Sequence, residues 1–154
     1  MHIQLRVGEP ADVEPIAELR AEAMRPDLER LGRYDEDRVR RRFREAYRPE
    51  HTRVVEVDGR LAGCVAVRPA EDGHWLEHFY LDPALHGRGI GSSVLAGLLT
   101  EADAAGHTLR LNVLQGSPAR RLYERSGFVL TGEDPMDVFM VRPPGSGAGS
   151  AAAR

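Results

Sequence analysis

The stretch from Asp82 to Ser92 contains residues whose types and spacing suit the binding of an anion. It has three glycines at alternate positions, one arginine, and no acidic residue after the first position. The apolar run before it predicts a strand, and the periodic segment after it predicts a helix. Glycine-rich backbone at a helix N-terminus turns N–H groups toward an anion, and the helix dipole favours its charge. The sequence therefore predicts a phosphate-binding loop here.

Three kinds of anion-binding loop are candidates for this stretch. A P-loop needs Gly-Lys-Ser/Thr, and the stretch contains no lysine. A dinucleotide fingerprint needs G-x-G-x-x-G in a parallel βαβ unit, but Ser92 stands at the third glycine position and the preceding strands are expected to be antiparallel. The third pattern is Q/R-x-x-G-x-G/A, which residues 86–91 match except at His86. A glycine-rich turn at a helix start, without a ligand, remains the alternative for the loop taken alone.

The elements that must position this loop follow the predicted order β-α-α-β-β-β-α-β-α-β-β. Strands are expected at residues 3–7, 52–57, 60–68, 74–81, 109–113, 128–132 and 138–142. Asp12 and Asp35 are expected to cap the first two helices, and Pro26 is expected to end the first helix. Asp58-Gly59 predicts a hairpin turn. This order predicts an α/β (α+β) fold, in which four helices cover a mixed, mostly antiparallel sheet of about seven strands.

The composition of the chain limits its function classes. Its 154 residues and its net charge of −3 fit one domain without the basic excess of a nucleic-acid binder. We expect a domain over residues 1–143 and a flexible tail over residues 144–154. No apolar run reaches a membrane span, and the N-terminus enters a strand rather than a signal peptide, so a cytoplasmic protein without membrane contact is expected. The single cysteine, Cys64, excludes an intrachain disulfide and is expected to be buried and inert.

Two charged groups of side chains have simple structural explanations. The six histidines are scattered along the chain, so we expect no metal site. Five arginines occur between Arg38 and Arg44. A solvated helix face balanced by Glu36, Asp37 and Glu45 explains them better than an acidic substrate or partner.

A second motif links the loop to a known family. Residues 117–128 resemble N-x-x-A-x-x-L-Y-E-x-x-G-F in a form one residue shorter. With the loop and the order of elements, the sequence resembles the GNAT family of acyl-CoA-dependent N-acetyltransferases over nearly the whole chain apart from the tail. His86 replaces the usual Gln or Arg, which matters little if backbone amides bind the anion. Ser117 replaces the usual Asn, which weakens a side-chain contact to the pantetheine arm.

The resemblance implies the GNAT fold, with acetyl-CoA as co-substrate and no metal. The pantetheine arm would enter between the fourth and fifth strands, and an N–H near Leu81 would polarise the thioester carbonyl. Tyr123 would act as the general acid by hydrogen-bonding the leaving sulfur. The residues implied in binding coenzyme A are Phe79, Tyr80, Leu81, His86, Gly87, Arg88, Gly89, Ile90, Gly91, Ser92 and Ser117.

The acceptor side of the reaction is harder to assign from the sequence. An alkylamine with a pKa of about 10.4 must lose a proton before it attacks, and Glu77 is the expected base. A carboxylate that only binds a cationic substrate is an equal alternative. By strand alternation Glu77 shares a face with Trp75 and Phe79, whereas His78 points to the other face and is expected to be structural. A bulge in this strand would reverse that ranking. The further residues expected at the substrate are Trp75, Asn112, Arg33 and Tyr34.

Together these expectations describe an N-acetyltransferase. It would move acetyl from acetyl-CoA to a primary amine, of a small molecule or of a peptide or protein, by direct attack in a ternary complex. A homodimer is compatible with the family. The alternative of another class is an acyl-CoA-binding sensor or regulatory module with the same fold and no turnover. A nucleotide-binding interaction domain is a second alternative.

Overall fold

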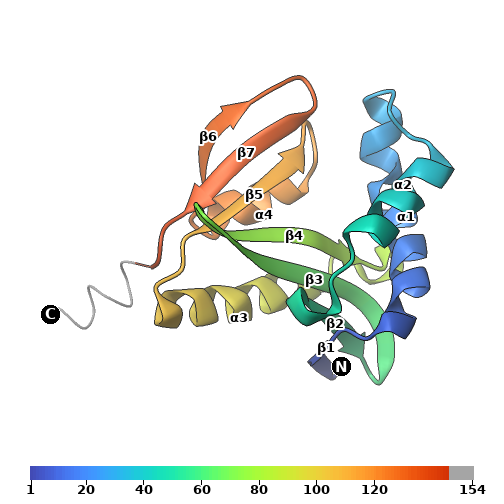
Figure 1. Cartoon of the computed structure of the whole chain (residues 1–154), viewed down its shortest axis with the longest axis horizontal. Coiled ribbons are helices and arrows are strands. Elements are labelled where there is room, and N and C mark those ends of the chain that lie inside the picture. The colour runs from blue at the N-terminus through green and yellow to red at the C-terminus, as the bar shows by residue number, and fades with distance from the viewer. Residues whose placement is uncertain (146–154) are drawn as a thin grey trace, which may run out of the picture. The chain divides into compact units, whose positions relative to one another are not determined.

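The structure, a computed structural model, describes residues 1–145, so the predicted tail at residues 144–154 lies almost wholly outside the described residues. Its strands are β1 (Ile3–Val7), β2 (Thr52–Val57), β3 (Arg60–Ala70), β4 (Gly73–Leu81), β5 (Leu109–Leu114), β6 (Val129–Glu133) and β7 (Asp137–Arg142). Its helices are α1 (Val13–Arg30), α2 (Glu36–Ala46), α3 (Ile90–Ala105) and α4 (Ala119–Arg125). The seven strands follow the order β1-β2-β3-β4-β5-β7-β6 in a mixed sheet (Figure 1). The predicted fold class and element order are confirmed.

The described chain divides into two compact units. The first comprises Met1–Val67 and Glu77–Ile90, and the second comprises Arg68–Leu76 and the residues from Gly91 onward. The second half of β4 and the predicted phosphate loop up to Ile90 belong to the first unit, whereas Gly91 and Ser92 belong to the second.

In the first unit, β1, β2 and β3 form an antiparallel meander covered by α1 and α2. The hairpin predicted at Asp58-Gly59 is confirmed, since both residues have positive φ angles, 51° and 82°. The core beneath the helices joins residues from five elements and the segment that follows α2: Ile16, Ala17, Phe43, Tyr47, Val54 and Cys64, with Tyr80 packed against them. This core fixes α1 against the second half of β4.

Helix α1 does not end at Pro26 as predicted but continues to Arg30. A proline inside a helix removes one backbone hydrogen bond and costs about 3 kcal/mol. Two ion pairs hold the turn that follows: Arg25 with Glu29 at 3.1 Å and Arg30 with Asp27 at 2.7 Å. The segment expected to connect the first two helices is therefore partly helical.

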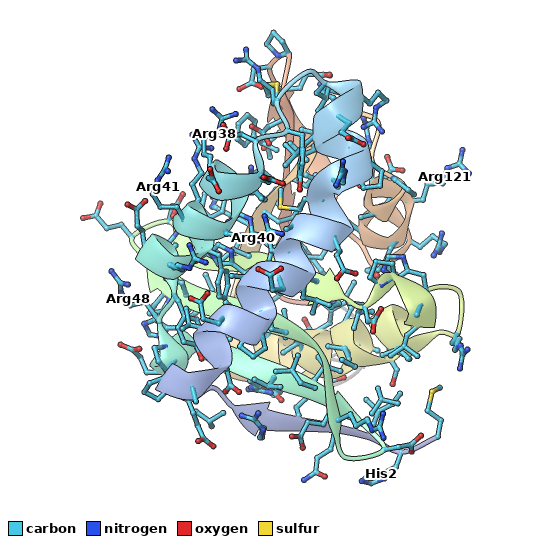
Figure 2. The ribbon with its side chains drawn as sticks, turned by 90° about the vertical axis from the view of Figure 1, so that its right-hand side faces the viewer. His2, Arg38, Arg40, Arg41, Arg48 and Arg121 are labelled. Atoms are coloured by element: carbon cyan, nitrogen blue, oxygen red, sulfur yellow. The ribbon has the colours of Figure 1, made fainter. Side chains whose placement is uncertain are left out.

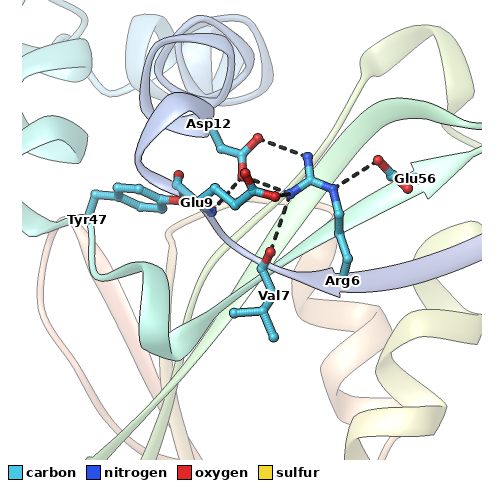
Figure 3. A network of polar contacts seen from close by, with 6 residues as sticks. All are labelled: Arg6, Val7, Glu9, Asp12, Tyr47 and Glu56. Atoms are coloured by element: carbon cyan, nitrogen blue, oxygen red, sulfur yellow. Dashed lines mark hydrogen bonds and ion pairs between the residues drawn. The ribbon is translucent and has the colours of Figure 1, made fainter.

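Asp12 stands at the N-cap position of α1, as predicted, but its carboxylate makes no cap bond to the helix because it is used elsewhere. Asp12 ends a 3-10 turn, makes no side-chain cap bond to α1, and accepts two hydrogen bonds from the Arg6 guanidinium, both at 2.9 Å (Figure 3). Arg6 also donates to Glu56 at 2.9 Å, so one arginine joins β1, β2 and the start of α1. Asp35, by contrast, caps α2 as predicted by accepting from the N–H groups of Asp37 and Arg38.

The arginines of α2 are balanced differently from the prediction. Arg40 pairs with Glu18 at 2.6 Å and Arg44 pairs with Glu14 at 2.8 Å, so carboxylates of α1 neutralise them rather than those of α2 itself. Arg41 is exposed and Arg38 half-buried, and they lie along one edge of α2 (Figure 2). The run therefore fastens α2 to α1 as well as presenting a solvated edge.

In the second unit, β7 pairs antiparallel with both β5 and β6, and the start of β4 pairs parallel with β5 at His74↔Leu109 and Trp75↔Arg110. The fourth and fifth strands are thus parallel neighbours. Arg142 of β7 joins Asp103 of α3 in an ion pair at 2.8 Å. Among residues 1–145, none of the helices has the length and hydropathy that crossing a lipid bilayer requires.

Candidate active site

The end of β4 is held very close to β3. A Cβ atom added to Gly63 would collide with the backbone oxygen of Tyr80 and would lie 3.2 Å from the Leu81 Cα atom. The Asp82 N–H donates to the Ala62 oxygen at 2.8 Å. Glycine at position 63 therefore allows the approach that fixes the backbone of Phe79 to Leu81, the segment predicted to meet the acyl donor.

The backbone of β4 is irregular at His78, which has a φ angle of +50°. A non-glycine residue in the left-handed region breaks the regular alternation of a strand. The face assigned to Glu77 from residue spacing therefore loses its basis, and the role of Glu77, which is half-buried, stays a prediction. His78 lies on the side of β4 that α2 covers, since its ring packs edge-on against Phe43 at 5.3 Å and its Nδ1 lies 3.1 Å from the Tyr80 hydroxyl.

The predicted phosphate loop starts directly after β4. The Asp82 carboxylate accepts from the Ala84 N–H at 2.9 Å and begins a 3-10 turn at Pro83–Leu85. The His86 ring then reaches back, with Nε2 3.1 Å from the Leu81 oxygen. Because a carbonyl oxygen only accepts, Nε2 carries the proton in this contact. His86 thus ties the loop to the end of β4 instead of extending toward solvent for a ligand.

Two of the loop glycines have left-handed backbone. Gly87 and Gly89 both have φ angles of +79°, and nothing lies within 4 Å of a Cβ added to either residue. Glycine is therefore favoured at these two positions because of the backbone conformation, since a side chain would have enough space. Alternating backbone hands turn successive N–H groups toward a common point, which is how a backbone binds an anion. Gly87, Arg88 and Gly89 are exposed, and α3 begins at the buried Ile90.

The second unit carries Tyr123 on α4. Its side chain is 8% exposed and its ring packs edge-on against Phe128 at 5.6 Å. Burial raises the pKa of the Tyr123 hydroxyl above its ordinary value. The group is therefore held in its protonated form, as a hydrogen-bond donor requires. Ser117 accepts from the Ala119 N–H at 3.2 Å and supports the first turn of α4, one residue away from the predicted helix start.

The other predicted acceptor residues have protein contacts of their own. In the second unit, the Asn112 amide donates to Asp137 at 3.0 Å and the Trp75 indole N–H donates to Asp72 at 3.2 Å. In the first unit, the Tyr34 ring lies under the Arg25 guanidinium at 4.8 Å, and the Arg33 carbonyl accepts from Arg38 at 3.0 Å. Tyr34 and Arg33 follow α1 directly, whereas Asn112 and Trp75 lie on strands. Their substrate roles stay predictions.

Cys64 is buried and free, as predicted, and burial raises the pKa of its thiol to about 12. A thiol in that environment is almost entirely protonated at neutral pH and is a poor nucleophile. Over residues 1–145 no group of three or more His, Cys, Asp or Glu side chains is arranged to hold a metal ion.

One polar residue of the first unit was missed by the sequence analysis. Arg20 of α1 has a buried Nε atom without a hydrogen-bond partner. The signal in the sequence is its position four residues after Ile16, where the apolar stripe of the helix continues. An arginine in such a stripe is ordinary when its side chain reaches solvent, so the sequence alone does not mark it.

Comparison with known proteins places these features in a family. The model described as "Acetyltransferase (GNAT) family" matches residues 14–128. A comparison with curated protein sequences finds no match. Among solved structures, a PaiA N-acetyltransferase from Thermoplasma acidophilum in complex with coenzyme A is 22% identical, with a TM-score of 0.76 over 93% of this chain and 99% of that one.

Two further solved structures share the fold at similar identity. The ribosomal-protein-S18-alanine N-acetyltransferase from Escherichia coli is 20% identical, with a TM-score of 0.71 over 93% of this chain and 94% of that one. The N-acetylglutamate synthase from Neisseria gonorrhoeae, complexed with coenzyme A and N-acetyl-glutamate, is 21% identical, with a TM-score of 0.67 over 94% of this chain and 36% of that one. Sequence identities this low show only that the fold is shared. The evidence for the family is the match of the family model over residues 14–128.

Proposed function

Because this chain belongs to the acetyltransferase (GNAT) family, we propose that it binds acetyl-CoA and transfers the acetyl group to a primary amine by direct attack in a ternary complex. The observation that carries the proposal is the backbone of the loop. Gly87 and Gly89 share a left-handed φ of +79°, the loop leads directly into α3, and His86 ties it to Leu81. This arrangement suits the pyrophosphate of coenzyme A.

In this proposal backbone groups bind the acyl donor. The segment Phe79–Leu81 pairs with the pantetheine amides, and an N–H near Leu81 polarises the thioester carbonyl as an oxyanion donor does. The loop from His86 to Ser92 holds the pyrophosphate, with Arg88 placed to neutralise phosphate charge. Ser117 completes the set at the start of α4. The close approach at Gly63 supports this assignment, since it fixes the backbone that the thioester would meet.

The chemical step needs a proton taken from the amine and a hydrogen bond given to the sulfur. Glu77 is proposed to accept the amine proton, directly or through water. Tyr123 is proposed to donate to the departing thiolate. Its raised pKa favours hydrogen-bond donation over full proton transfer, because a tyrosine is a weaker acid than a thiol. His78 is engaged with Phe43 and Tyr80, which favours a packing role.

A thermal-shift comparison of acetyl-CoA, CoA and ADP tests the donor half. Saturating acetyl-CoA, at about 100 times its Kd, should raise the Tm by about 5–10 °C, and ADP should raise it less. The absence of any shift with both CoA species would refute the proposal. Equal shifts with ADP and CoA would instead indicate a nucleotide-binding domain.

Release of free CoA thiol across a library of primary amines tests the acceptor half. The chain contains no lysine, so its own side chains offer no acceptor amine. Tyr123→Phe and Glu77→Gln should each lower kcat by at least about 100-fold while the acetyl-CoA thermal shift is retained. Binding of acetyl-CoA without thiol release from any amine would identify a sensor module rather than an enzyme.

A further inference from the structure

Arg20 is a charged residue placed on the core-facing stripe of α1. Ile16 and Ala17, one turn before it, are fully buried, and Leu19 and Ala21 beside it are also buried. The Arg20 side chain is itself half-buried, with its Nε atom enclosed and without an acceptor. No residue within the described range 1–145 provides a carboxylate to its guanidinium. A buried donor without a partner costs stability, so its retention needs a reason.

The contacts around Arg20 are aromatic. Its guanidinium carbon lies 5.9 Å from the centre of the Tyr80 ring, within cation–π range. Tyr80 in turn contacts His78 through its hydroxyl at 3.1 Å, and the Phe43 ring lies 6.5 Å from the Tyr80 ring. These four residues, Arg20, Phe43, His78 and Tyr80, are called the acceptor face below. An aromatic ring attracts the cation but accepts none of its five N–H groups in the way an oxygen does.

Glu14 and Glu18 of α1, and Asp12 just before it, are engaged with other arginines. Glu14 is paired with Arg44 at 2.8 Å and Glu18 with Arg40 at 2.6 Å, both on the side that faces α2. Asp12 accepts two hydrogen bonds from Arg6. Arg20 therefore has no carboxylate partner among residues 1–145, and it lies beside Tyr80 of the segment Phe79–Leu81, where the proposed function places the thioester.

From this geometry we infer that Arg20 binds a carboxylate of the acceptor, so that the acceptor is an amino acid or another amine that carries a carboxylate. The inference rests on the proposed function for the identity of the neighbouring thioester, but the binding of the anion stands on Arg20 itself. A guanidinium presents two parallel N–H groups that match the two oxygens of a carboxylate. One guanidinium neutralises the single charge of a carboxylate, whereas a phosphate dianion would keep excess charge at a half-buried position.

Binding to the CoA-saturated protein tests the inference without turnover. Each amino acid is compared with its own amide, and the acid should have a Kd at least about 10-fold lower than the amide. Arg20→Met should abolish that preference by weakening the acids about 10- to 100-fold, as expected for a charge-assisted pair. Arg20→Lys should retain part of it, since it keeps the charge but loses the fork. Arg44→Met, which removes an exposed paired arginine, is the control and should leave the preference intact.

The stability of the unliganded protein separates ligand binding from a packing role. Arg20→Met removes an unpaired buried donor and should leave the Tm unchanged or higher, whereas an arginine needed for packing would lower it. Equal affinity for acids and amides in the parent protein, or tighter binding of aminophosphonates than of amino acids, would overturn the inference. Turnover of amines without an acid preference would also overturn it while leaving the proposed function intact. Arg20-dependent acid binding without any turnover would support it and refute the transferase proposal.

Discussion

The predicted phosphate loop and the proposed acceptor face both adjoin the segment Phe79–Leu81, and they are built in different ways. The loop depends on backbone conformation: left-handed Gly87 and Gly89, a histidine bonded to a carbonyl, and one exposed arginine. The acceptor face depends on side chains, with a guanidinium and three rings brought together from α1, α2 and β4. A site built from backbone groups suits a ligand that stays the same, such as the proposed coenzyme A. A site built from side chains can be altered by substitution to suit a different acceptor.

Gly63→Ala should give the largest effect, because it disturbs the segment that the two regions share. The added Cβ collides with the Tyr80 backbone, and overpacking against backbone costs about 3 kcal/mol. Thermal denaturation should show a Tm about 6–12 °C lower, together with weaker binding of both acetyl-CoA and acceptor. Gly97→Ala in α3 is the control, since nothing lies within 4 Å of its Cβ and alanine favours a helix. Equal stability of the two variants would contradict this account of Gly63.

Asp12→Asn should act on the acceptor face alone, through the start of α1. It removes the carboxylate that binds Arg6 and should destabilise the protein by about 2 kcal/mol. The hydrogen bond from Arg6 lowers the pKa of Asp12 in the folded state. The stabilisation is therefore complete above the unfolded pKa near 4 and is lost as the pH falls through the lower folded value.

Acid denaturation of the parent protein and of Asp12→Asn checks this prediction. Their stability difference should be constant from pH 5 to 7 and should shrink on further acidification. A difference that widened below pH 4 would contradict the assignment. The KM for acetyl-CoA should be unchanged in the variant, which separates the two regions.

Gly89→Ala should act on the loop alone. An L-residue at a φ of +79° is strained by about 1–2 kcal/mol, so the Kd for acetyl-CoA should rise by about 10-fold. In Gly89→Asn the Kd for acetyl-CoA should rise less, because Asn tolerates the left-handed region. Isothermal titration with acetyl-CoA measures both values. The Kd of the acceptor for the CoA-saturated variants should equal that for the parent protein. An equal loss of acceptor affinity would show that the loop and the acceptor face do not act independently.

Tyr80→Phe should give the smallest effect, and it separates the role of the Tyr80 ring from that of its hydroxyl. It keeps the ring beside Arg20 and removes the hydroxyl 3.1 Å from His78. Loss of one hydrogen bond is worth about 1 kcal/mol, so kcat/KM for the acceptor should fall by about five-fold at most. A loss as large as that of Arg20→Met would show that the hydroxyl, not the ring, organises the face.

The loop was predictable because it depends on local conformation. Alternate glycines before a periodic segment specify left-handed backbone at a helix start, whatever lies elsewhere in the chain. The hairpin at Asp58-Gly59 and the cap at Asp35 were predictable for the same reason. The missing cap bond of Asp12 and the continuation of α1 past Pro26 have a different cause. The Asp12 carboxylate binds Arg6 instead of capping α1, and ion pairs stabilise the helical turn after Pro26. In both places side-chain contacts outweigh the local conformational preference.

The acceptor face was not predictable because its members meet only in the folded chain. Arg20 becomes unusual only when Tyr80 is seen beside it and Glu14 and Glu18 of the same helix are found paired with other arginines. His78 is similar, since the strand pattern predicts an ordinary extended residue and the structure gives it a positive φ. The assignment of Glu77 from alternation depended on that extended conformation.

The proline within α1 divides the helix into two parts with different opening equilibria. Pro26 has no N–H, so the carbonyl of Glu22 receives no helical hydrogen bond and the turn beyond it is joined by fewer backbone bonds. What keeps that turn closed are the exposed pairs of Arg25 with Glu29 and Arg30 with Asp27, and such pairs weaken as salt screens them. We therefore expect amide hydrogen exchange of residues 27–31 to become faster as ionic strength rises, while the part of α1 that carries Arg20 keeps the protection of the core.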